Sequence, residues 1–402
     1  MRILCLTSRL PYPPNRGDRL RAFHFIEHLA RHHELHLASF IAGDDERAHL
    51  PALREHCREV HVVRMTAAHS AVAVAGSVWR RQPLQALYYR SRAMRRLVAR
   101  MAATTHFDAA YVHLFRMAPY AIGLSHLYRV VDLTDAISAE IERSLPYRGL
   151  ASRLLYRIES PRIARYECWV ARNFEETWLI SEADRQILAG RCGEGNLRVV
   201  PNGVDLDEFH PAGRPPKPDN IILVGHMGVM HNVDAARYLA TEVLPRVRQH
   251  VPRATLTLAG ADPVPAVRQL GEVPGVEVTG FVEDLNACLN RASVFAAPLR
   301  FSAGVQNKVL EAMAAGRPVV TTSTVNHGLG AVPGRQLLVA DDATTMAADI
   351  VALFRDPERR AALGRAGRHF VEEHYTWQHA VARMDAIERR LSSGFASPQN
   401  VL

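Results

Sequence analysis

The loop and helix that follow one apolar strand carry residue types suited to binding a phosphate group. The stretch is APLRFSAGVQNKVLEAMAAGRPVV, residues 297–320. Gly304 lets the backbone approach a ligand because it has no Cβ atom. The helix predicted just after it offers unpaired N–H groups and a positive dipole end to an anion. Arg300 and Lys308 bracket that point, and their charges can neutralise a diphosphate.

Glu311 adds a hydrogen-bond acceptor to this set. It lies three residues after Lys308, on the same helix face, where it can accept hydrogen bonds from the vicinal hydroxyls of a ribose. A nucleoside diphosphate would therefore satisfy all of these residues at once. The alternative is that Lys308 and Glu311 form an ordinary surface pair and that Gly304 is an ordinary loop glycine.

Apolar strands alternate with segments of helical length along the whole chain. This alternation predicts right-handed crossovers and an α/β fold of two Rossmann-like, doubly wound parallel-sheet domains. The strands are expected at 2–8, 34–40, 60–65, 108–114, 129–134, 177–181 and 197–200, and then at 220–225, 254–260, 276–280, 293–299, 317–322 and 336–340.

A stretch rich in Pro, Gly, Asn and Asp separates the two series of strands and has the composition of a hinge. We therefore expect a first domain of residues 1–200, a second of residues 201–375, and a C-terminal helix and tail, 376–402, that packs back on the first domain. The carboxyl ends of both sheets should face one interdomain cleft, where ligands of such sheets bind.

The composition sets broad limits on the class of protein. The chain has 402 residues, of which 48% are hydrophobic and 22% charged, which is enough for two cores and argues against disorder. Its formal net charge of +8 favours anionic partners, such as phosphates or membrane surfaces, without choosing between them. The five cysteines show no metal-ligand spacing, which predicts a reduced, cytoplasmic setting and no metal site. No apolar run is long enough to span a bilayer, so we expect any membrane contact to be peripheral.

Several motifs together resemble a known family. PLRFSAGVQNKVLEAMAAGRPVV, VPNGVD and GHMGVMHNVDAARYL are similar to the family-4 (group 1) retaining glycosyltransferases, which have the GT-B fold. RLPYPPNRGDRLRAFHFIEHLARHHELHLASF and QPLQALYYRS resemble a subgroup linked to bacterial exopolysaccharide and exosortase loci. The resemblance implies a metal-independent hexosyltransferase without a cofactor, whose UDP- or GDP-type nucleotide sugar is a substrate. The sugar would pass with retention to a hydroxyl of a glycan or lipid-linked glycan, while the departing phosphate helps to deprotonate that hydroxyl.

The resemblance also extends the expected donor site. It implies phosphate contacts in the loop after the strand at 220–225 and contacts between the base and the backbone of the loop at 280–285. The alternative for the second loop is a plain turn in which Glu283 and Asp284 start a helix. The expected donor-binding residues are Gly17, His226, His231, Phe281, Val282, Gly304, Val305, Gln306, Asn307 and Glu311.

Two features depart from the family pattern, one before Glu311 and one in the loop after Val224. Many members carry a glutamate eight residues before Glu311, where this chain has Ala303, and this puts the usual sugar contacts in doubt. His226 and His231 stand in the loop where members often have an arginine and a lysine. Neutral histidines supply little charge at pH 7, so we expect Arg300 and Lys308 to carry most of the pyrophosphate charge. The alternative for His231 is a solvent-exposed residue at a helix start.

In the first domain, the resemblance selects His113 at a strand end as a contact of the donor sugar near the reacting carbon. Together with Arg300 and Lys308, it makes up the expected catalytic set; the alternative is a structural histidine. Arg16, Arg19 and Asp135 are expected at the acceptor, and Arg21 is an alternative to the two arginines. Asp135 has the alternative of capping the helix that follows it.

Residues 79–101, WRRQPLQALYYRSRAMRRLVARM, hold seven arginines and no acid. Interleaved aromatic and aliphatic residues predict a basic amphipathic helix that binds an anionic membrane surface, on the inner face of the membrane. A solvated helix face is the alternative. No nucleic-acid recognition motif accompanies the charge, so nucleic acid is not an expected partner.

Two rival functions share the expected fold. A nucleotide-sugar epimerase would have the same nucleotide pocket, and Ala303 leaves room for a catalytically silent subunit of a polysaccharide complex. An NAD-dependent dehydrogenase does not fit, because neither first strand leads into GxGxxG.

Overall fold

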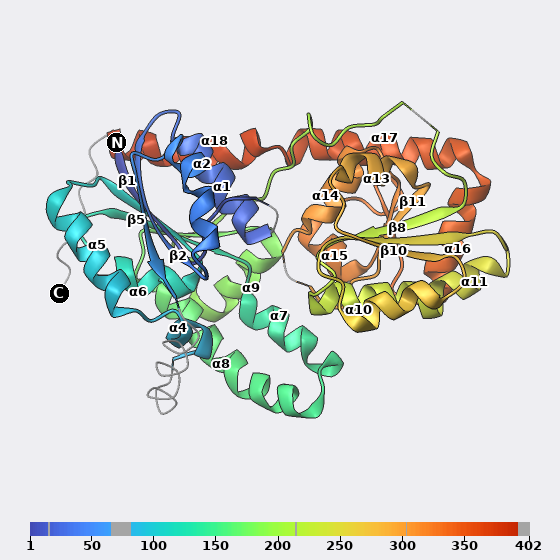
Figure 1. Ribbon diagram of the computed structural model, residues 1–402, viewed down its shortest axis with the longest axis horizontal. Coiled ribbons are helices and arrows are strands. Elements are labelled where there is room, and N and C mark those ends of the chain that lie inside the picture. Colours follow the sequence, from blue (N-terminus) through green and yellow to red (C-terminus); the bar gives the residue numbers. More distant parts are fainter. Residues whose placement is uncertain (15–16, 66–81, 214, 303, 393–402) are drawn as a thin grey trace. The chain divides into compact units, whose positions relative to one another are not determined.

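The computed structural model describes residues 1–14, 17–65, 82–213, 215–302 and 304–392 (Figure 1). Several positions discussed above therefore lie outside the described residues: Arg16, Ala303, residues 79–81 of the basic segment and residues 393–402 of the C-terminal tail. The chain divides into one domain made of Met1–Val200 with the chain from Val381, and a second made of Pro201–Ala380.

The first domain is built on a seven-stranded parallel sheet of order β3-β2-β1-β4-β5-β6-β7. Its central strands are almost wholly buried because helices cover both faces, with α1 on one side and α5 on the other (Figure 1). The strands are β1 (Arg2–Thr7), β2 (Glu34–Ile41), β3 (Glu59–Arg64), β4 (Ala109–His113), β5 (Tyr128–Thr134), β6 (Glu176–Leu179) and β7 (Leu197–Val199). The main helices are α1 (Gly17–Leu29), α2 (Leu50–Arg54), α4 (Leu84–Tyr88), α5 (Arg92–Thr104), α6 (Ala118–Ala121), α7 (Ile137–Ser144), α8 (Leu150–Arg172) and α9 (Glu182–Cys192).

The second domain repeats this plan with a six-stranded parallel sheet of order β10-β9-β8-β11-β12-β13. The strand order reverses between β8 and β11, and a ligand of such a sheet binds where the order reverses. The strands are β8 (Asn220–Val224), β9 (Thr255–Ala259), β10 (Val276–Gly280), β11 (Val294–Ala297), β12 (Val319–Thr321) and β13 (Leu338–Val339). The helices include α10 (Met230–Tyr238), α11 (Leu244–Arg248), α12 (Pro265–Arg268), α13 (Leu285–Arg291), α14 (Asn307–Ala314), α15 (Ser323–Leu329), α16 (Ala343–Arg355) and α17 (Pro357–His374). All thirteen expected strands are thus confirmed, with shorter bounds at several ends.

The stretch that its composition marked as a hinge is anchored on the second domain. The N–H of Val204 donates to the carbonyl of Tyr375 at 2.8 Å, and the backbone of Gly203 runs so close to Trp377 that a Cβ would lie 2.3 Å from its nitrogen. The last helix, α18 (Trp377–Ser392), passes to the first domain at Val381. There Ile387 is buried and shares a small apolar pocket with Ile3.

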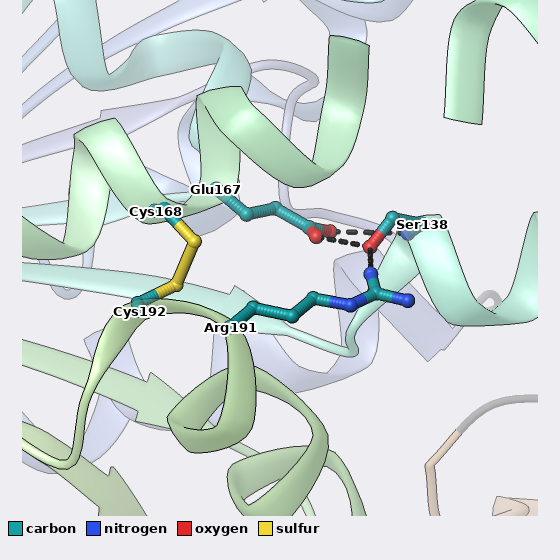
Figure 2. The surroundings of a disulfide bond; sticks show 5 residues. All are labelled: Ser138, Glu167, Cys168, Arg191 and Cys192. Atoms are coloured by element: carbon teal, nitrogen blue, oxygen red, sulfur yellow. Dashed lines mark hydrogen bonds between the residues drawn. A yellow bond between two sulfur atoms is a disulfide. The ribbon is translucent and has the colours of Figure 1, made fainter. Parts of the chain in front are cut away.

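The expectation of reduced cysteines is wrong for one pair. Cys168 in α8 and Cys192 at the end of α9 form a disulfide (Figure 2). The two residues are 24 positions apart, but α8 and α9 pack together and bring their Cα atoms within 5.1 Å. A sequence spacing could not reveal this pair because helix packing brings it together. Cys5, Cys57 and Cys288 are free thiols.

The expectation of a membrane-binding helix at 79–101 is also wrong for its described part. Residues 82–101 form α4 and the larger part of α5, and the apolar face of α5 is in the core, where Met94, Leu97 and Val98 are buried. A helix that buries its apolar face in the protein cannot insert that face into lipid. The arginines of α5 instead form a solvated basic face, which was the alternative. Among the described residues, no helix is both long enough and apolar enough to cross a bilayer.

Candidate functional site

The opening motif forms a tight turn that leads into α14. Gly304 adopts φ +57°, in the left-handed region where glycine is favoured, and a Cβ on the nearby Gly328 would lie 2.2 Å from the Gly304 carbonyl oxygen. The helix starts at Asn307, and its residues Val309 and Leu310 are buried against the sheet. The first-turn N–H groups of α14 therefore stand next to a backbone turn in which a side chain has little room.

Lys308 lies in the first turn of α14, and its ammonium group donates to the side-chain oxygen of Asn232 in α10. The side-chain nitrogen of Asn232 in turn donates to the carbonyl of His226 at 2.9 Å. Burial lowers the pKa of Lys308 to about 8, while the nearby Glu311 opposes this shift. Lys308 thus retains its charge at neutral pH, although its hydrogen-bond partner is a neutral amide.

Glu311 lies one turn after Lys308. Burial, and to a smaller extent Glu208, raise its pKa to about 7, and Lys308 opposes the shift. Burial also raises the pKa of Glu208, as do the neighbouring Asp205 and Asp284. The structure therefore brings a second carboxyl group, from the stretch that begins at Pro201, near the one expected to bind a ribose.

The same stretch also supplies Asn202, which is buried and donates to the side-chain oxygen of Asn307 at 2.7 Å. Sequence reasoning missed Asn202, Glu208 and Asn232 as members of this cluster. The first lies within the VPNGVD motif and the last within GHMGVMHNVDAARYL, so the motifs contained the signal. Their spatial relation to Lys308 and Asn307 depends on packing between distant segments.

The loop between β8 and α10 approaches the same cluster. A Cβ on Gly225 would lie 2.9 Å from the side-chain nitrogen of Asn232, so only glycine fits there without a shift. His226 is held by neighbours: its Nε2 lies 2.8 Å from Asp262 and its Nδ1 accepts from the N–H of Gly228 at 3.3 Å. Burial and the charge of Lys308 lower the pKa of His231 to about 3, so this histidine is neutral and is not the exposed helix-start residue of the alternative.

Arg300 has a different environment from Lys308. Its Nε and Nη2 donate to the two carboxylate oxygens of Asp234 at 2.9 and 2.5 Å, and its guanidinium lies over the ring of Tyr238. It lines an open pocket of about 640 Å³ together with Arg237 and Arg246. The charge of Arg300 is therefore compensated by Asp234, whereas Lys308 contacts an uncharged partner.

The remaining expected donor residues lie on two loops. Phe281 follows β10 and is 69% exposed, and Val282 comes next in the same loop. Asp284 caps α13 by accepting from the N–H of Ala287 at 2.7 Å, as the helix-start alternative predicted. The other loop carries Val305, which is buried, and Gln306, which is the N-cap residue of α14.

In the first domain, His113 ends β4 and is buried, with its ring stacked on Tyr111 at 6.4 Å. The hydroxyl of Tyr111 donates to Asp132 at 2.8 Å, and Asp132 also accepts from Nε of the fully buried Arg21 at 2.6 Å. Leu114 follows His113 at φ +70°. Non-glycine residues rarely adopt positive φ, and they tend to occur at functional sites.

The expected acceptor residues fall in separate environments. Arg19 in α1 pairs with Glu46 at 2.7 Å. Gly17, expected at the donor, is the first residue of α1. The capping alternative for Asp135 is wrong, because the N-cap residue of α7 is Ala136 and the N–H of Ser138 in the first turn donates to Glu167. Burial, Asp184 and Glu140 raise the pKa of Asp135 well above its usual value.

No cluster of three or more His, Cys, Asp or Glu side chains with the arrangement of a metal site occurs among the residues that the structure describes.

Comparison with known proteins agrees with the parallel-sheet fold of each domain and with the motif at α14. Residues 218–356 match the family model "Glycosyl transferases group 1". The GDP-mannose-dependent α-(1-6)-phosphatidylinositol monomannoside mannosyltransferase of Mycolicibacterium smegmatis is 31% identical over 214 residues, which cover 47% of this chain and 55% of that enzyme. The chain thus matches about half the length of this relative.

Solved structures are similar over nearly the whole chain. Sucrose-phosphate synthase from Thermosynechococcus elongatus superposes with a TM-score of 0.73 at 16% identity, covering 98% of this chain and 100% of that one. Anabaena HepE in complex with UDP superposes with a TM-score of 0.67 at 17% identity and the same coverage. At this identity the likeness concerns the fold, which is GT-B. The second domain is thus similar to the group 1 glycosyltransferases, and the GT-B fold extends over nearly the whole chain.

Proposed function

We propose that this protein transfers a sugar from a nucleoside-diphosphate sugar to a hydroxyl group of a glycan acceptor. The observation that carries the proposal is Lys308, a cation with a neutral partner in the first turn of α14, beside the turn at Gly304. A diphosphate bound there would gain the charge of Lys308 and the N–H groups of the helix. The UDP complex of HepE, a protein of the same fold, supports a donor of this class.

Each further residue has a role in this proposal. Glu311 accepts hydrogen bonds from the ribose hydroxyls, and the exposed Phe281 and the backbone of Val282 contact the base. Arg300 orients α10 through Asp234 and comes into contact with the diphosphate only if that ion pair opens. His113 positions the sugar.

In the proposed reaction the bond between the anomeric carbon and the diphosphate oxygen breaks as the acceptor oxygen bonds to the same face of that carbon, so that configuration is retained. The departing phosphate takes the proton of the acceptor hydroxyl. Lys308 and the start of α14 stabilise the negative charge of the leaving group, a task that needs no metal ion.

We further propose that the acceptor is a lipid-linked glycan of exopolysaccharide synthesis. The similarity to a mannosyltransferase whose name specifies a phosphatidylinositol mannoside acceptor supports a lipid-linked substrate. The N-terminal motifs that resemble exopolysaccharide-associated transferases support the setting. The donor base stays open between UDP and GDP types, since that relative is named for GDP-mannose and HepE was crystallised with UDP.

Thermal unfolding against UDP, GDP, UDP-glucose and GDP-mannose tests the donor site, because a ligand that binds the native state raises its Tm. We expect one nucleotide class to raise Tm and Lys308→Ala to abolish the rise. The chain has only two lysines, so Lys217→Ala, at an exposed position, is a matched control that should respond as wild type does. No shift with any of the four ligands would contradict the proposal.

A second assay separates transfer from its two rivals. The donor selected by thermal shift is incubated with and without membrane lipid extract, and nucleotide release and sugar products are followed by mass spectrometry. Extract-dependent incorporation of the sugar is the expected result. An epimerised donor without extract would indicate the epimerase, and binding without any turnover in either arm would indicate the silent subunit.

A further inference from the structure

The first turns of α8 expose a row of aliphatic side chains. Leu150, Leu154 and Ile158 follow one another at intervals of four residues, so they form a stripe along one helix face, and Leu155 lies beside it. Their side chains are 84%, 64%, 49% and 46% exposed, in the order Leu150, Leu154, Ile158 and Leu155. A contiguous apolar surface of this kind usually marks an interaction site.

This surface belongs to a well-anchored hairpin. Figure 1 shows α7 and the start of α8 extending away from the sheet of the first domain. At the base of the hairpin, Ser138 in α7 donates to Glu167 in α8, and Arg191 in α9 donates to Ser138 (Figure 2). The disulfide between Cys168 and Cys192 ties α8 to α9 at the same level. These hydrogen bonds and the disulfide therefore hold in place the hairpin that carries the exposed stripe.

The tip of the hairpin is also strongly basic. Residues 143–158 contain four arginines and no aspartate or glutamate. Arg153 donates to the backbone carbonyls of Leu145 and Pro146, and Arg148 lies over the ring of Tyr156 at 3.9 Å. Three acidic residues lie next to this group. Glu140 interacts with Arg143 and Arg148, and burial raises its pKa, whereas Glu142 pairs with Arg191 and Glu159 with Arg162. Most of the positive charge at the tip is thus uncompensated.

We propose that the α7–α8 hairpin, through the stripe Leu150, Leu154, Leu155 and Ile158, inserts into an anionic lipid surface. Aliphatic side chains enter the acyl boundary while the flanking arginines pair with lipid phosphates, a combination that binds helices to such membranes. A second copy of the chain fits less well, because self-association through this face would bring two sets of arginines together. The proposal is independent of the transfer reaction.

Vesicle co-sedimentation of the full chain tests the proposal, with one vesicle set of equal parts phosphatidylglycerol and phosphatidylcholine and one of phosphatidylcholine alone. We expect at least tenfold stronger partitioning to the anionic vesicles. The double variant Leu154→Gln with Ile158→Gln should lose at least tenfold of that partitioning. Arg157→Gln with Arg165→Gln, at exposed positions of the same helix, should lose about 25-fold, or about fivefold for each arginine.

Two controls locate the effect. Arg96→Gln with Arg100→Gln removes the same charge from the exposed face of α5 and should change partitioning less than threefold. Val332→Gln changes an exposed aliphatic residue of the second domain and should have no effect. All variants alter exposed side chains, so their Tm should equal that of the wild type.

Three outcomes would overturn the proposal. The first is wild-type protein that does not sediment with anionic vesicles. The second is an α5 variant that loses as much binding as the α8 variants. The third is a wild type that does not bind vesicles and is a dimer by size-exclusion chromatography with light scattering, while the variant Leu154→Gln with Ile158→Gln is a monomer. That result would assign the stripe to self-association.

Discussion

The ammonium group of Lys308 is hydrogen-bonded to the amide oxygen of Asn232, so the cation at the start of α14 faces a neutral group on α10. A carboxylate in place of Asn232 would compensate the charge of Lys308, as Asp234 does for Arg300 two positions further along the same helix. The two cations that flank the Gly304 loop therefore differ in what they can offer to an anion. Only a ligand that brings negative charge would give Lys308 a charged partner comparable to the one that Arg300 already has.

The pKa of Lys308 is directly measurable, because this chain has only two lysines. Reductive methylation with ¹³C-formaldehyde should give two lysine resonances in the NMR spectrum, and Lys308→Arg assigns them. We expect the resonance of Lys308 to titrate near pH 8, because burial disfavours the charged form. A Lys308 resonance that titrates near the ordinary lysine value would show that this ammonium group is hydrated.

The affinity for the nucleoside diphosphate should depend on pH in the same range. The bound anion favours charged Lys308, so below about pH 8 the lysine is already protonated, and above it binding must take up a proton. We expect the affinity for UDP or GDP, measured calorimetrically, to be level between pH 7 and 8 and to fall about tenfold per unit at higher pH. Lys308→Arg, which stays charged, should remove that fall. A fall that persists in this variant would place the titrating group elsewhere.

Glu311 should destabilise the fold in the absence of ligand. Its folded-state pKa of about 7 lies above its ordinary value of 4.5, so the folded protein holds the proton more tightly than the unfolded chain. Stability from this group is complete below pH 4.5 and is lost as the pH rises through 7. Glu311→Gln should therefore raise the free energy of unfolding at pH 8 by about 1 to 2 kcal/mol, and much less at pH 5.

The same variant separates a ligand role from a structural one. Glu311→Gln should weaken nucleotide binding even though it stabilises the protein, because an amide oxygen accepts hydrogen bonds from ribose hydroxyls less strongly than a carboxylate does. Calorimetric titration of the ligand measures this, and denaturant titration measures the stability. A variant that is more stable and binds the nucleotide as wild type does would give Glu311 no part in the donor site.

The sequence predicted the strands and helices well where they depend on neighbouring residues in the chain. Hydrophobic periodicity located the strands of both sheets, and the polar loop at Gly304 predicted the start of α14 near Asn307. It could not predict the partners of the charged residues, because those depend on packing. Arg300 meets Asp234 across 66 positions, and Cys168 meets Cys192 only because α8 and α9 pack together.

The basic segments illustrate the same limit. In sequence, α5 and the start of α8 both mix arginines with aliphatic residues, and α5 has the denser charge. The difference is that Met94 and Leu97 of α5 are in the core, whereas Leu150 and Leu154 of α8 are exposed. Amphipathicity shows that a helix has an apolar face, but burial in the fold decides whether that face is available to lipid.

The disulfide should contribute measurably to stability. Closing a loop of 24 residues removes chain entropy from the unfolded state, which corresponds to about 3 kcal/mol at 25 °C. We expect Cys168→Ser with Cys192→Ser to lower the free energy of unfolding by that amount. Dithiothreitol should lower wild-type stability equally and leave the double variant unchanged. A wild type that is insensitive to the reductant would show that the two thiols are not joined in solution.

Removing one partner of the buried pair of Arg21 and Asp132 should lower the free energy of unfolding strongly, whereas replacing both should lower it much less. Both side chains are fully buried, and Asp132 also accepts from the hydroxyl of Tyr111, which stacks on His113. Asp132→Asn removes the carboxylate that accepts from the buried guanidinium of Arg21, so we expect a loss of about 3 to 5 kcal/mol in the free energy of unfolding. Arg21→Met leaves the carboxylate unpaired and should cost a similar amount. Combining Arg21→Met with Asp132→Asn removes both charges and should cost much less than the sum of the two single losses.

The exposed pair of Arg64 and Asp44 is the control. The same substitutions there should leave the free energy of unfolding unchanged, because solvent screens this pair. If the losses in the free energy of unfolding for Arg21→Met and Asp132→Asn were additive, each residue would act through other contacts. Packing alone would then hold Tyr111 against His113.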